Sequence, residues 1–275
     1  MRILQLGKFY PVLGGVEKVM FDITSGLSET GVECDMMCAT SDGRGSEVIG
    51  LNPCGRVICC KTWMKKARTT IAPSMITDLR RRVNDYDIIH IHHPDPMAAV
   101  ALMLSGFKGK VVLHWHSDIL SQKTLLKFYL PIQNWLIKRA DAIVGTSPVY
   151  LAESPYLQKV QGKNRCIPIG IVPNRSDSAK VQGIRNEYAG RKIIFSLGRL
   201  VEYKGYRYLI EAAKYLDDSH IILIGGGGPL REELERQIDD LGVRSRVRLL
   251  GKVSDEDLPS YYGACDLFCL SSIMK

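Results

Sequence analysis

Residues 196–212 read SLGRLVEYKGYRYLIEA, the end of an apolar strand followed by a helix-like segment. Arg199 and Lys204 lie five residues apart across this strand-to-helix turn. A helix N-terminus already carries unpaired N–H groups and about half a positive charge. Two further cations at that end therefore predict a binding site for a strong anion, and a diphosphate would suit it.

Apolar runs of the same kind recur along the chain, separated by helix-like segments. They are nearly continuous, which indicates strands covered on both faces, as in a parallel sheet with crossover helices. The fold class is therefore α/β. The first-half runs are RILQLGKF at 2, ECDMMCAT at 33, RVICCK at 56, DIIHIHH at 87, KVVLHWH at 110, AIVGTS at 142 and RCIPIGI at 165. The second-half runs are KIIFSLGR, HIILIGGG, RVRLLGKV and LFCLSS.

The strand pattern restarts after a polar stretch at 172–191. Because a chain of 275 residues has room for two cores, we expect two domains, 1–175 and 190–275. The second domain shows only four strands, whereas doubly wound halves usually have about five or six. We therefore expect it to be incomplete, or the sequence to be a fragment.

Composition and cysteine spacing limit the classes of protein. A hydrophobic content of 45% and a charged content of 24% are those of a globular protein. No run approaches the roughly 20 apolar residues of a membrane span, and the N-terminus lacks a signal-peptide layout, so the expected location is cytoplasmic. The eight cysteines form no C-x-x-C pair, which favours buried free thiols over zinc ligands or disulfides.

The net charge of +8 is concentrated in residues 56–82, where eight Lys and Arg side chains against one acid give +7. This segment is either a solvated loop and helix face or a patch for anionic lipid with Trp63 as an interfacial anchor. We expect the patch. Nucleic acid is not expected, because no nucleic-acid module signature is present. The expected membrane and acceptor patch is Trp63, Lys65, Lys66, Arg68, Arg80 and Arg81.

In open parallel sheets a ligand lies beyond the carboxyl ends of the strands. Gly14 and Gly15 follow the first strand and open a helix, where they either admit a phosphate or form only a turn. The spacing is not G-x-G-x-x-G, which disfavours a nicotinamide cofactor. In the second half, the run at 225–228 is expected to enter a helix at Pro229 with backbone N–H groups facing the ligand.

Two pairs of histidines alternate along neighbouring strands, His90 with His92 and His114 with His116. They could form a metal cluster, but packed rings are expected and no metal is predicted. His116 ends its strand and should reach the ligand cleft, where it could hydrogen-bond a hydroxyl-rich substrate. The DYD motif at 85–87 imitates a metal-binding D-x-D, yet it precedes its strand, so its acids are expected to be solvated turn residues.

Seven segments together resemble the retaining GT-B glycosyltransferases of family 4, most closely the rhamnosyl/mannosyltransferases of surface-polysaccharide synthesis. They are GKFYPVLGGVEKV, HWHSD, RADAIVGTSP, IPIGI, SLGRLVEYKG, IGGGGPLREEL and CDLFCLSS. The resemblance covers essentially the whole chain, and G-R-L-x-x-x-K-G after a strand is its most specific element. It implies two Rossmann-like, doubly wound parallel-sheet domains that face a cleft.

The resemblance also implies roles for individual residues. The second domain would bind a nucleotide-diphospho-sugar and the first an acceptor. The implied catalytic residues are His116, which would contact the transferred sugar, and Arg199 and Lys204, which would clamp the diphosphate. Lys252 and Val253 would lie near the base, and Gly15 near the diphosphate. The full donor-binding set is Gly14, Gly15, Arg199, Lys204, Gly226, Gly227, Gly228, Pro229, Lys252 and Val253.

The implied reaction retains the anomeric configuration through an oxocarbenium-like transition state, and the leaving phosphate receives the acceptor proton. No metal and no cofactor beyond the sugar donor is then required. GDP-mannose is the leading donor, with a rhamnose or other hexose donor next. The acceptor would be a lipid-linked oligosaccharide of lipopolysaccharide, O-antigen or capsule synthesis, which places the enzyme peripherally on the cytoplasmic face of the inner membrane.

One departure from the family pattern leaves an alternative open. A segment such as S-E-x-F-G-x-x-x-x-E should follow LSS, but the sequence ends at Lys275 before it. The chain is therefore interpreted as truncated at the C-terminus. The alternative function is that of an inactive relative serving as a binding or interaction module.

Overall fold

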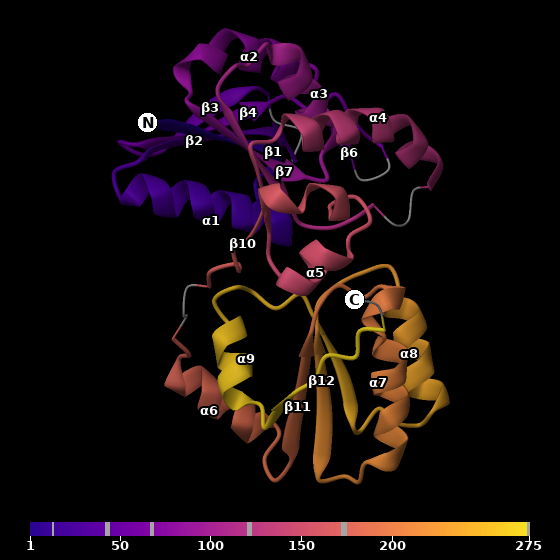
Figure 1. Cartoon of the computed structure of the whole chain (residues 1–275). Helices are drawn as coiled ribbons and strands as arrows, with labels where there is room; N and C mark the ends of the chain where they lie inside the picture. The colour runs from indigo at the N-terminus through magenta and orange to yellow at the C-terminus, as the bar shows by residue number, and fades with distance from the viewer. Residues whose placement is uncertain (13, 42–44, 67–68, 120–122, 172–174, 274–275) are drawn as a thin grey trace. The chain divides into compact units, whose positions relative to one another are not determined.

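The computed structural model describes residues 1–12, 14–41, 45–66, 69–119, 123–171 and 175–273. The chain divides into two compact units, Met1–Gly170 and Ile171–Lys275, which Figure 1 shows in indigo to magenta and in orange to yellow. Each unit is built around its own sheet.

In the described part of the first unit, eight strands form one sheet in the order β10-β9-β8-β7-β1-β2-β4-β3. Neighbouring strands pair in parallel except β3 and β4, which are antiparallel. The order reverses between β1 and β7, which makes that pair the topological switch point. The strands are β1 (Arg2–Tyr10), β2 (Glu33–Thr40), β3 (Glu47–Asn52), β4 (Gly55–Cys60), β7 (Ile88–His93), β8 (Lys110–Trp115), β9 (Ala142–Gly145) and β10 (Asn164–Cys166).

Helices cover both faces of this sheet. Those of the first unit are α1 (Gly15–Glu29), α2 (Ser74–Arg82), α3 (Pro96–Ser105), α4 (Lys123–Arg139) and α5 (Pro148–Glu153), with 3-10 turns η1 (Val83–Asp85) and η2 (Gln158–Lys163). Side chains of α2, α3 and α4 share one core with Leu4, Leu6 and Ile91 of the sheet. Met20 of α1 packs with Met36 of the strands on the other face. The apolar runs are nearly continuous because both faces of their strands are buried.

Helix α3 shows how local sequence sets its ends. The Asp95 carboxylate accepts a hydrogen bond from the Ala98 N–H at 3.0 Å, and Pro96 is the first helical residue. Gly106 ends the helix in the left-handed region at φ 76°. The helix has ten residues and is largely buried. Among the described residues, no helix combines the length and apolar character that crossing a membrane requires.

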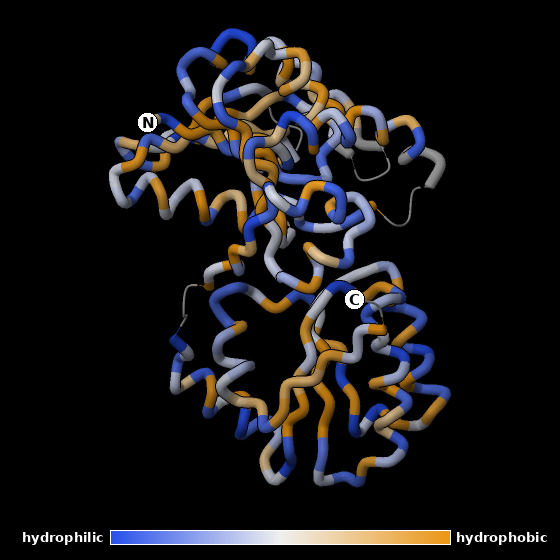
Figure 2. Tube along the Cα trace, viewed as in Figure 1, coloured by the Kyte–Doolittle hydropathy of each residue, from blue (hydrophilic) through white to orange (hydrophobic). Residues whose placement is uncertain are grey.

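The second unit holds a parallel sheet in the order β13-β12-β11-β14, with its switch point between β11 and β14. Helices α7 and α8 pack on one face, and α6 and α9 on the other. Figure 2 shows hydrophobic residues along the strands and mixed colours along the helices. The elements are α6 (Ser178–Glu187), β11 (Lys192–Leu197), η3 (Glu202–Lys204), α7 (Tyr206–Ala212), η4 (Ala213–Tyr215), β12 (His220–Gly225), α8 (Arg231–Asp240), β13 (Val247–Gly251), α9 (Leu258–Ala264) and β14 (Leu267–Phe268).

The sequence reading identified the parallel α/β class and the strands that carry it, but not every strand. It missed β3, and it missed the small hairpin of β5 (Met64–Lys66) and β6 (Thr69–Ile71). These strands are short or lie at a sheet edge, so they lack the apolar run that marks a buried strand. The expected strand at 165 is also shorter than its apolar run, because only Asn164–Cys166 pairs with β9.

Candidate active site

Three loops meet at the carboxyl edge of the sheet in the second unit. They follow β11, β12 and β13 and contain most of the residues expected to bind the donor. Backbone N–H groups tie the loops together, from Gly198 to the Gly225 oxygen (3.0 Å), from Leu200 to Gly227 (3.0 Å) and from Gly226 to Gly251 (2.6 Å). The residues after the three strands therefore form one continuous surface.

The glycines of the second loop have different roles. A Cβ on Gly226 would collide with the carbonyl oxygen of Gly198, and one on Gly228 with that of Leu200. Both glycines are needed because another loop crosses them. A Cβ on Gly227 would have no atom within 4 Å. Of the three, Gly227 is the position that leaves room for a ligand.

The expected helix start at Pro229 was wrong, and the expectation that backbone N–H groups face a ligand fails for Gly226. Helix α8 begins at Arg231, because Pro229 lies in a preceding turn in which the Arg231 N–H bonds the Gly228 oxygen. The Gly226 N–H does not face a ligand, since it donates to Gly251. A run of glycines indicates a tight loop, but it does not show whether a ligand or another loop fills the space.

Unpaired positive charge gathers at this edge. Arg199 is exposed and Lys204 is half-buried, with its Nζ 5.6 Å from the centre of the Tyr203 ring. Within the described residues, no acid forms an ion pair with Arg199, Lys204 or Lys252. Nearby Arg207 differs, because it pairs with acids of η3 and α8 at 3.5 and 2.9 Å. This edge can therefore attract an anion.

The segment after β14 supports the turn that carries Lys204. The Ser271 hydroxyl donates to the Lys204 carbonyl oxygen at 2.9 Å, and the Ile273 N–H donates to the Tyr203 oxygen at 2.9 Å. Gly205, at φ 67°, has no room for a Cβ because the Ser271 carbonyl lies against it. The sequence reading missed Ser271. Its position just beyond a strand at the switch point is the signal that could have found it.

Lys252 and Val253 lie just beyond β13, as expected. Lys252 is exposed, whereas a Cβ on Gly225 would lie only 2.9 Å from Val253 Cγ2. Val253 therefore packs against the end of β12. The role of these two residues near a base stays a prediction.

The first unit has a small cavity of about 50 Å³ at the switch point between β1 and β7. Asp95 both caps α3 and accepts the Lys8 N–H, and the Lys8 ammonium donates to the Pro94 carbonyl oxygen. Lys8 is a cation that the sequence reading did not select, although it follows directly on the apolar part of the first strand. The lining residues are Lys8, Phe9, Glu17, Thr70, Pro94, Asp95 and Pro96.

Gly14 and Gly15 stand at the start of α1. Gly14 is the N-cap and Gly15 the first helical residue. A Cβ on Gly14 would lie 2.6 Å from a carboxylate oxygen of Glu17, whereas a Cβ on Gly15 would meet nothing within 4 Å. Gly15 is thus the open position of the pair. Glu17 is buried in the first turn, where its charge complements the helix dipole.

The four alternating histidines lie together on one face of the sheet. The rings of His114 and His116 stack with centroids 4.1 Å apart, and those of His90 and His92 with centroids 4.8 Å apart. Trp115 lies on the opposite face, stacked on His93 at 3.9 Å. The four histidines and Trp115 therefore lie on opposite faces of the sheet, as predicted.

Burial keeps these imidazoles neutral. It lowers the pKa of His90 to about 3, of His114 to about 4 and of His116 to about 2, and neighbouring cationic or imidazole groups lower the pKa of His90 and His116 further. It also holds the pKa of His92 well below its ordinary value. At neutral pH each ring carries a single proton, so each offers one donor and one acceptor.

One nitrogen from each of His90, His92 and His114 lies within 4.8 Å of the others. Nitrogens bound to one zinc at 2.0–2.1 Å would lie about 3.4 Å apart. Both nitrogens of His92 are hydrogen-bonded, to Gln5 and to His116. The three rings are also stacked, so their lone pairs lie in nearly parallel planes and do not converge on one point. This geometry favours packed neutral rings. The expectation of no metal stays a prediction.

The basic segment is partly exposed. Trp63 is 80% exposed and Arg81 78% exposed, and Arg80 is also exposed, in the last turn of α2. A cation in the last turn also complements the helix dipole, which is a purely structural reason for both arginines. The backbone of Lys65 and Lys66 lies in β5, but their side chains, and all of Arg68, lie outside the described residues.

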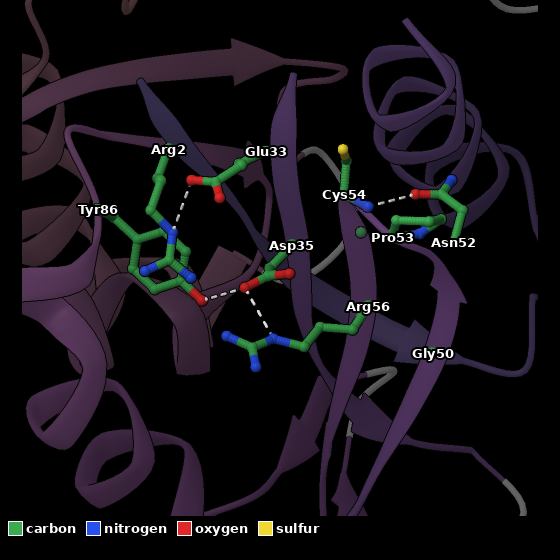
Figure 3. A pocket seen from close by; sticks show the side chains of 10 residues that line it. Arg2, Glu33, Asp35, Gly50, Asn52, Pro53, Cys54, Arg56 and Tyr86 are labelled. Carbon is green, nitrogen blue, oxygen red and sulfur yellow. Dashed lines mark hydrogen bonds and ion pairs between the residues drawn. The ribbon is translucent and has the colours of Figure 1, made fainter. Parts of the chain in front are cut away.

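A cavity of about 260 Å³ lies at the opposite, amino-terminal edge of the first sheet (Figure 3). The Asp35 carboxylate accepts from Arg56 Nε at 3.1 Å and from the Tyr86 hydroxyl at 2.7 Å. Arg2 pairs with Glu33 at 3.1 Å. Charges in this cavity therefore neutralise one another, and Arg56 does not contribute a free cation to the basic segment.

The acids of the DYD motif lie at this same edge. Asp87 accepts the Arg2 N–H at 2.8 Å, and Asp85 ends η1; both are exposed. They precede β7 instead of following it. Their predicted place, away from the carboxyl ends of the strands, is confirmed.

Two family models match the chain. "Glycosyltransferase Family 4" covers residues 13–175, and "Glycosyl transferases group 1" covers residues 177–275. The O-antigen chain mannosyltransferase C of Escherichia coli is 32% identical over 270 residues, covering 96% of this chain and 71% of that protein. The D-rhamnosyltransferase WbpZ of Pseudomonas aeruginosa is 29% identical over 263 residues, covering 94% and 67%.

Solved structures share the fold. Anabaena Alr3699/HepE in complex with UDP matches with a TM-score of 0.73 at 19% identity, covering 100% of this chain and 75% of that one. WaaG, a glycosyltransferase involved in lipopolysaccharide biosynthesis, matches with a TM-score of 0.67 at 16% identity, covering 100% and 76%. The two parallel sheets, the family models and the relatives agree: the chain belongs to glycosyltransferase family 4, with the GT-B fold, and is a glycosyltransferase.

Proposed function

We propose that this protein transfers a mannose- or rhamnose-type hexose, with retention of configuration, from a nucleotide-diphospho-sugar to a lipid-linked oligosaccharide. The sugar is in keeping with the names of the mannosyltransferase and the rhamnosyltransferase reported above. The setting would be lipopolysaccharide, O-antigen or capsule synthesis, in keeping with the name of the O-antigen chain mannosyltransferase. The observation that carries the proposal is the set of cations without acid partners among the described residues, Arg199, Lys204 and Lys252, at the carboxyl edge of the second sheet.

Sugar transfer from a nucleotide diphosphate requires positive charge beside the diphosphate. When the bond between sugar and phosphate breaks, negative charge accumulates on the leaving diphosphate. Cations that are already in position stabilise that charge more than they stabilise the ground state. Arg199 offers a planar fork of donors, and the turn that carries Lys204 is anchored through Ser271. The leaving phosphate receives the acceptor proton, and this step needs no metal.

The resemblance assigns the other selected residues to the same donor. Gly227 and Gly15 have open space where a side chain would be, so a diphosphate could approach their backbones. Lys252 and Val253 would lie near the base, and neutral His116 would contact the transferred sugar. Gly14, Gly226, Gly228 and Pro229 would contribute by shaping the loops. GDP-mannose is the leading donor, although the HepE complex contains UDP.

A lipid-linked acceptor requires the enzyme to work at a membrane surface. We assign that contact to an anionic surface on the cytoplasmic face of the inner membrane. Exposed Trp63 would insert at the interface while Arg80 and Arg81 attract the lipid charge. Lys65, Lys66 and Arg68 belong to the same proposal from the sequence.

The test is calorimetric titration of the folded chain with GDP, UDP and dTDP. One nucleotide should bind, and the Arg199→Ala, Lys204→Ala double variant should lose at least about a hundredfold in affinity, because each of two hydrogen bonds to a charged group contributes about 1.5–3 kcal/mol. Arg207→Ala is the matched control, since this nearby cation is already paired. Equal affinities of the double variant and the wild type would refute the proposal.

A transfer assay completes the test. Mass spectrometry of a lipid-linked oligosaccharide incubated with the preferred nucleotide sugar should show the added hexose. Nucleotide binding without transfer or donor hydrolysis would instead support the alternative function, a binding module.

A further inference from the structure

Gln5 of β1, His92 of β7 and His116, which follows β8, form a chain of hydrogen bonds. Gln5 of β1 has its amide oxygen 2.8 Å from His92 Nε2, and His92 of β7 has its Nδ1 2.9 Å from His116 Nε2. Gln5 and His92 are both fully buried. Buried polar side chains require hydrogen-bond partners, and here each side chain bonds the next one in the series.

The chemical nature of the first atom sets the direction of the whole chain. An amide oxygen only accepts hydrogen bonds, so His92 must hold its proton on Nε2. A neutral ring has one such proton, which leaves His92 Nδ1 as an acceptor. His116 must then donate from its own Nε2. The Gln5 amide nitrogen faces the Cys34 sulfur at 3.8 Å, which is consistent with this orientation of the amide.

With its proton on Nε2, His116 holds a lone pair on Nδ1, a nitrogen for which the described residues provide no hydrogen-bond partner. Burial disfavours a second proton on this ring, and the positive charge of Lys8 disfavours it further. A neutral ring with that tautomer accepts a hydrogen bond and does not donate one at the free position.

We propose that Gln5 and His92 are positioning residues that fix the tautomer of His116, so that its Nδ1 accepts a hydrogen bond from a hydroxyl group of the transferred sugar. This inference rests on the proposed role of His116 in sugar binding. It deepens that role by naming the chemistry that the site selects: a sugar with a free O–H at the contacting position. A deoxy or O-methyl analogue would leave the nitrogen without its donor, and sites of this kind discriminate strongly against such analogues.

The direct test is NMR of the full chain labelled with ¹⁵N-histidine. Long-range proton–nitrogen correlation distinguishes a protonated from an unprotonated ring nitrogen. His116 should show a protonated Nε2 and an unprotonated Nδ1. The opposite assignment would overturn the proposal, and this measurement needs neither a variant nor a substrate.

Variants of Gln5 test whether this residue fixes the tautomer of His116. Gln5→Met removes the acceptor and should give His116 a mixture of tautomers, whereas Gln5→Glu keeps an acceptor oxygen and should retain the wild-type tautomer. Tyr129→Phe is the matched control, because it removes a hydrogen bond to buried His93 on the other face of the sheet. An unchanged His116 tautomer in folded Gln5→Met would overturn the assignment of Gln5.

Binding measurements separate the contribution of the sugar to affinity from that of the nucleotide. In Gln5→Met the preference for nucleotide sugar over free nucleotide should fall about fivefold, the value of one hydrogen bond, while affinity for the nucleotide alone stays within about twofold. Gln5→Glu should restore the preference. A wild type that binds no nucleotide sugar would refute the proposed function, whereas sugar binding with His116 protonated on Nδ1 would refute this inference alone.

Discussion

The hydroxyl of Ser271 donates a hydrogen bond to the carbonyl oxygen of Lys204 at 2.9 Å, although 67 residues separate them in sequence. The contact joins the segment after β14 to the turn η3 at the switch point of the second sheet. One candidate cation is therefore held in place by a loop from another strand. Precise placement matters for a charge that must meet a developing anion.

Removing that contact should loosen the Lys204 turn. We expect Ser271→Ala to weaken nucleotide affinity about fivefold, which corresponds to about 1 kcal/mol for one hydrogen bond. Calorimetric titration measures the change. Ser272→Ala is the control, because this neighbouring serine is exposed. Equal losses in the two variants would show that the Lys204 contact is not the cause.

The two neighbouring glycines of the second loop should respond to alanine in opposite ways. Gly226→Ala should lower the free energy of unfolding by about 2 kcal/mol or more, because φ is 127° and the Gly198 oxygen occupies the space. Gly227→Ala should leave stability nearly unchanged, since nothing lies within 4 Å of its Cβ.

Urea unfolding distinguishes the two alanine variants. If Gly227 faces the donor, Gly227→Ala should also weaken nucleotide binding at wild-type stability. A Gly227→Ala protein that binds normally would remove Gly227 from the donor site.

The buried histidines predict loss of stability in acid. Burial lowers the pKa of His114 from 6.5 to about 4, so between these values the unfolded chain binds more protons than the folded chain. Stability is therefore complete above about pH 6.5 and falls as the pH decreases toward 4. Each such ring adds a slope of about 1.4 kcal/mol per pH unit within its window.

Urea unfolding from pH 7 to pH 4 measures this slope. His114→Phe keeps a stacking ring without a titrating group, so its slope should be smaller than that of the wild type by about one proton. An identical slope in both proteins would contradict the burial effect assigned to His114.

Binding to anionic vesicles should depend on the exposed part of the basic segment. We expect the Trp63→Ala, Arg80→Gln, Arg81→Gln variant to bind vesicles of anionic phospholipid at least about tenfold more weakly, because each arginine near such a surface contributes about 1 kcal/mol. Vesicle sedimentation measures this. Tyr215→Ala is the control, an aromatic side chain in the second unit that is 84% exposed. Neither the wild type nor the triple variant should bind zwitterionic vesicles appreciably.

Much of this fold can be predicted from short segments of the sequence. Residues 33–40 were expected to be a strand from their apolar run, and β2 spans that range. The ends of α3 follow from Asp95, Pro96 and Gly106. Strand runs, caps and left-handed glycines depend on interactions between residues close in the chain, so a single segment contains the information. The rule that ligands lie beyond the carboxyl ends of strands then led to Arg199, Lys204 and His116.

Other features depend on which distant segments meet. The sequence did not reveal that Gly226 makes room for the Gly198 carbonyl, or that Gln5 and His92 orient His116. These contacts require the register between strands, and hydrogen bonds between side chains many residues apart leave no local pattern. The sequence by itself determined the class of fold, the family and the edge at which to look. Only the tertiary structure decided which side chains support the site, because those partners are chosen by sheet order and loop crossing.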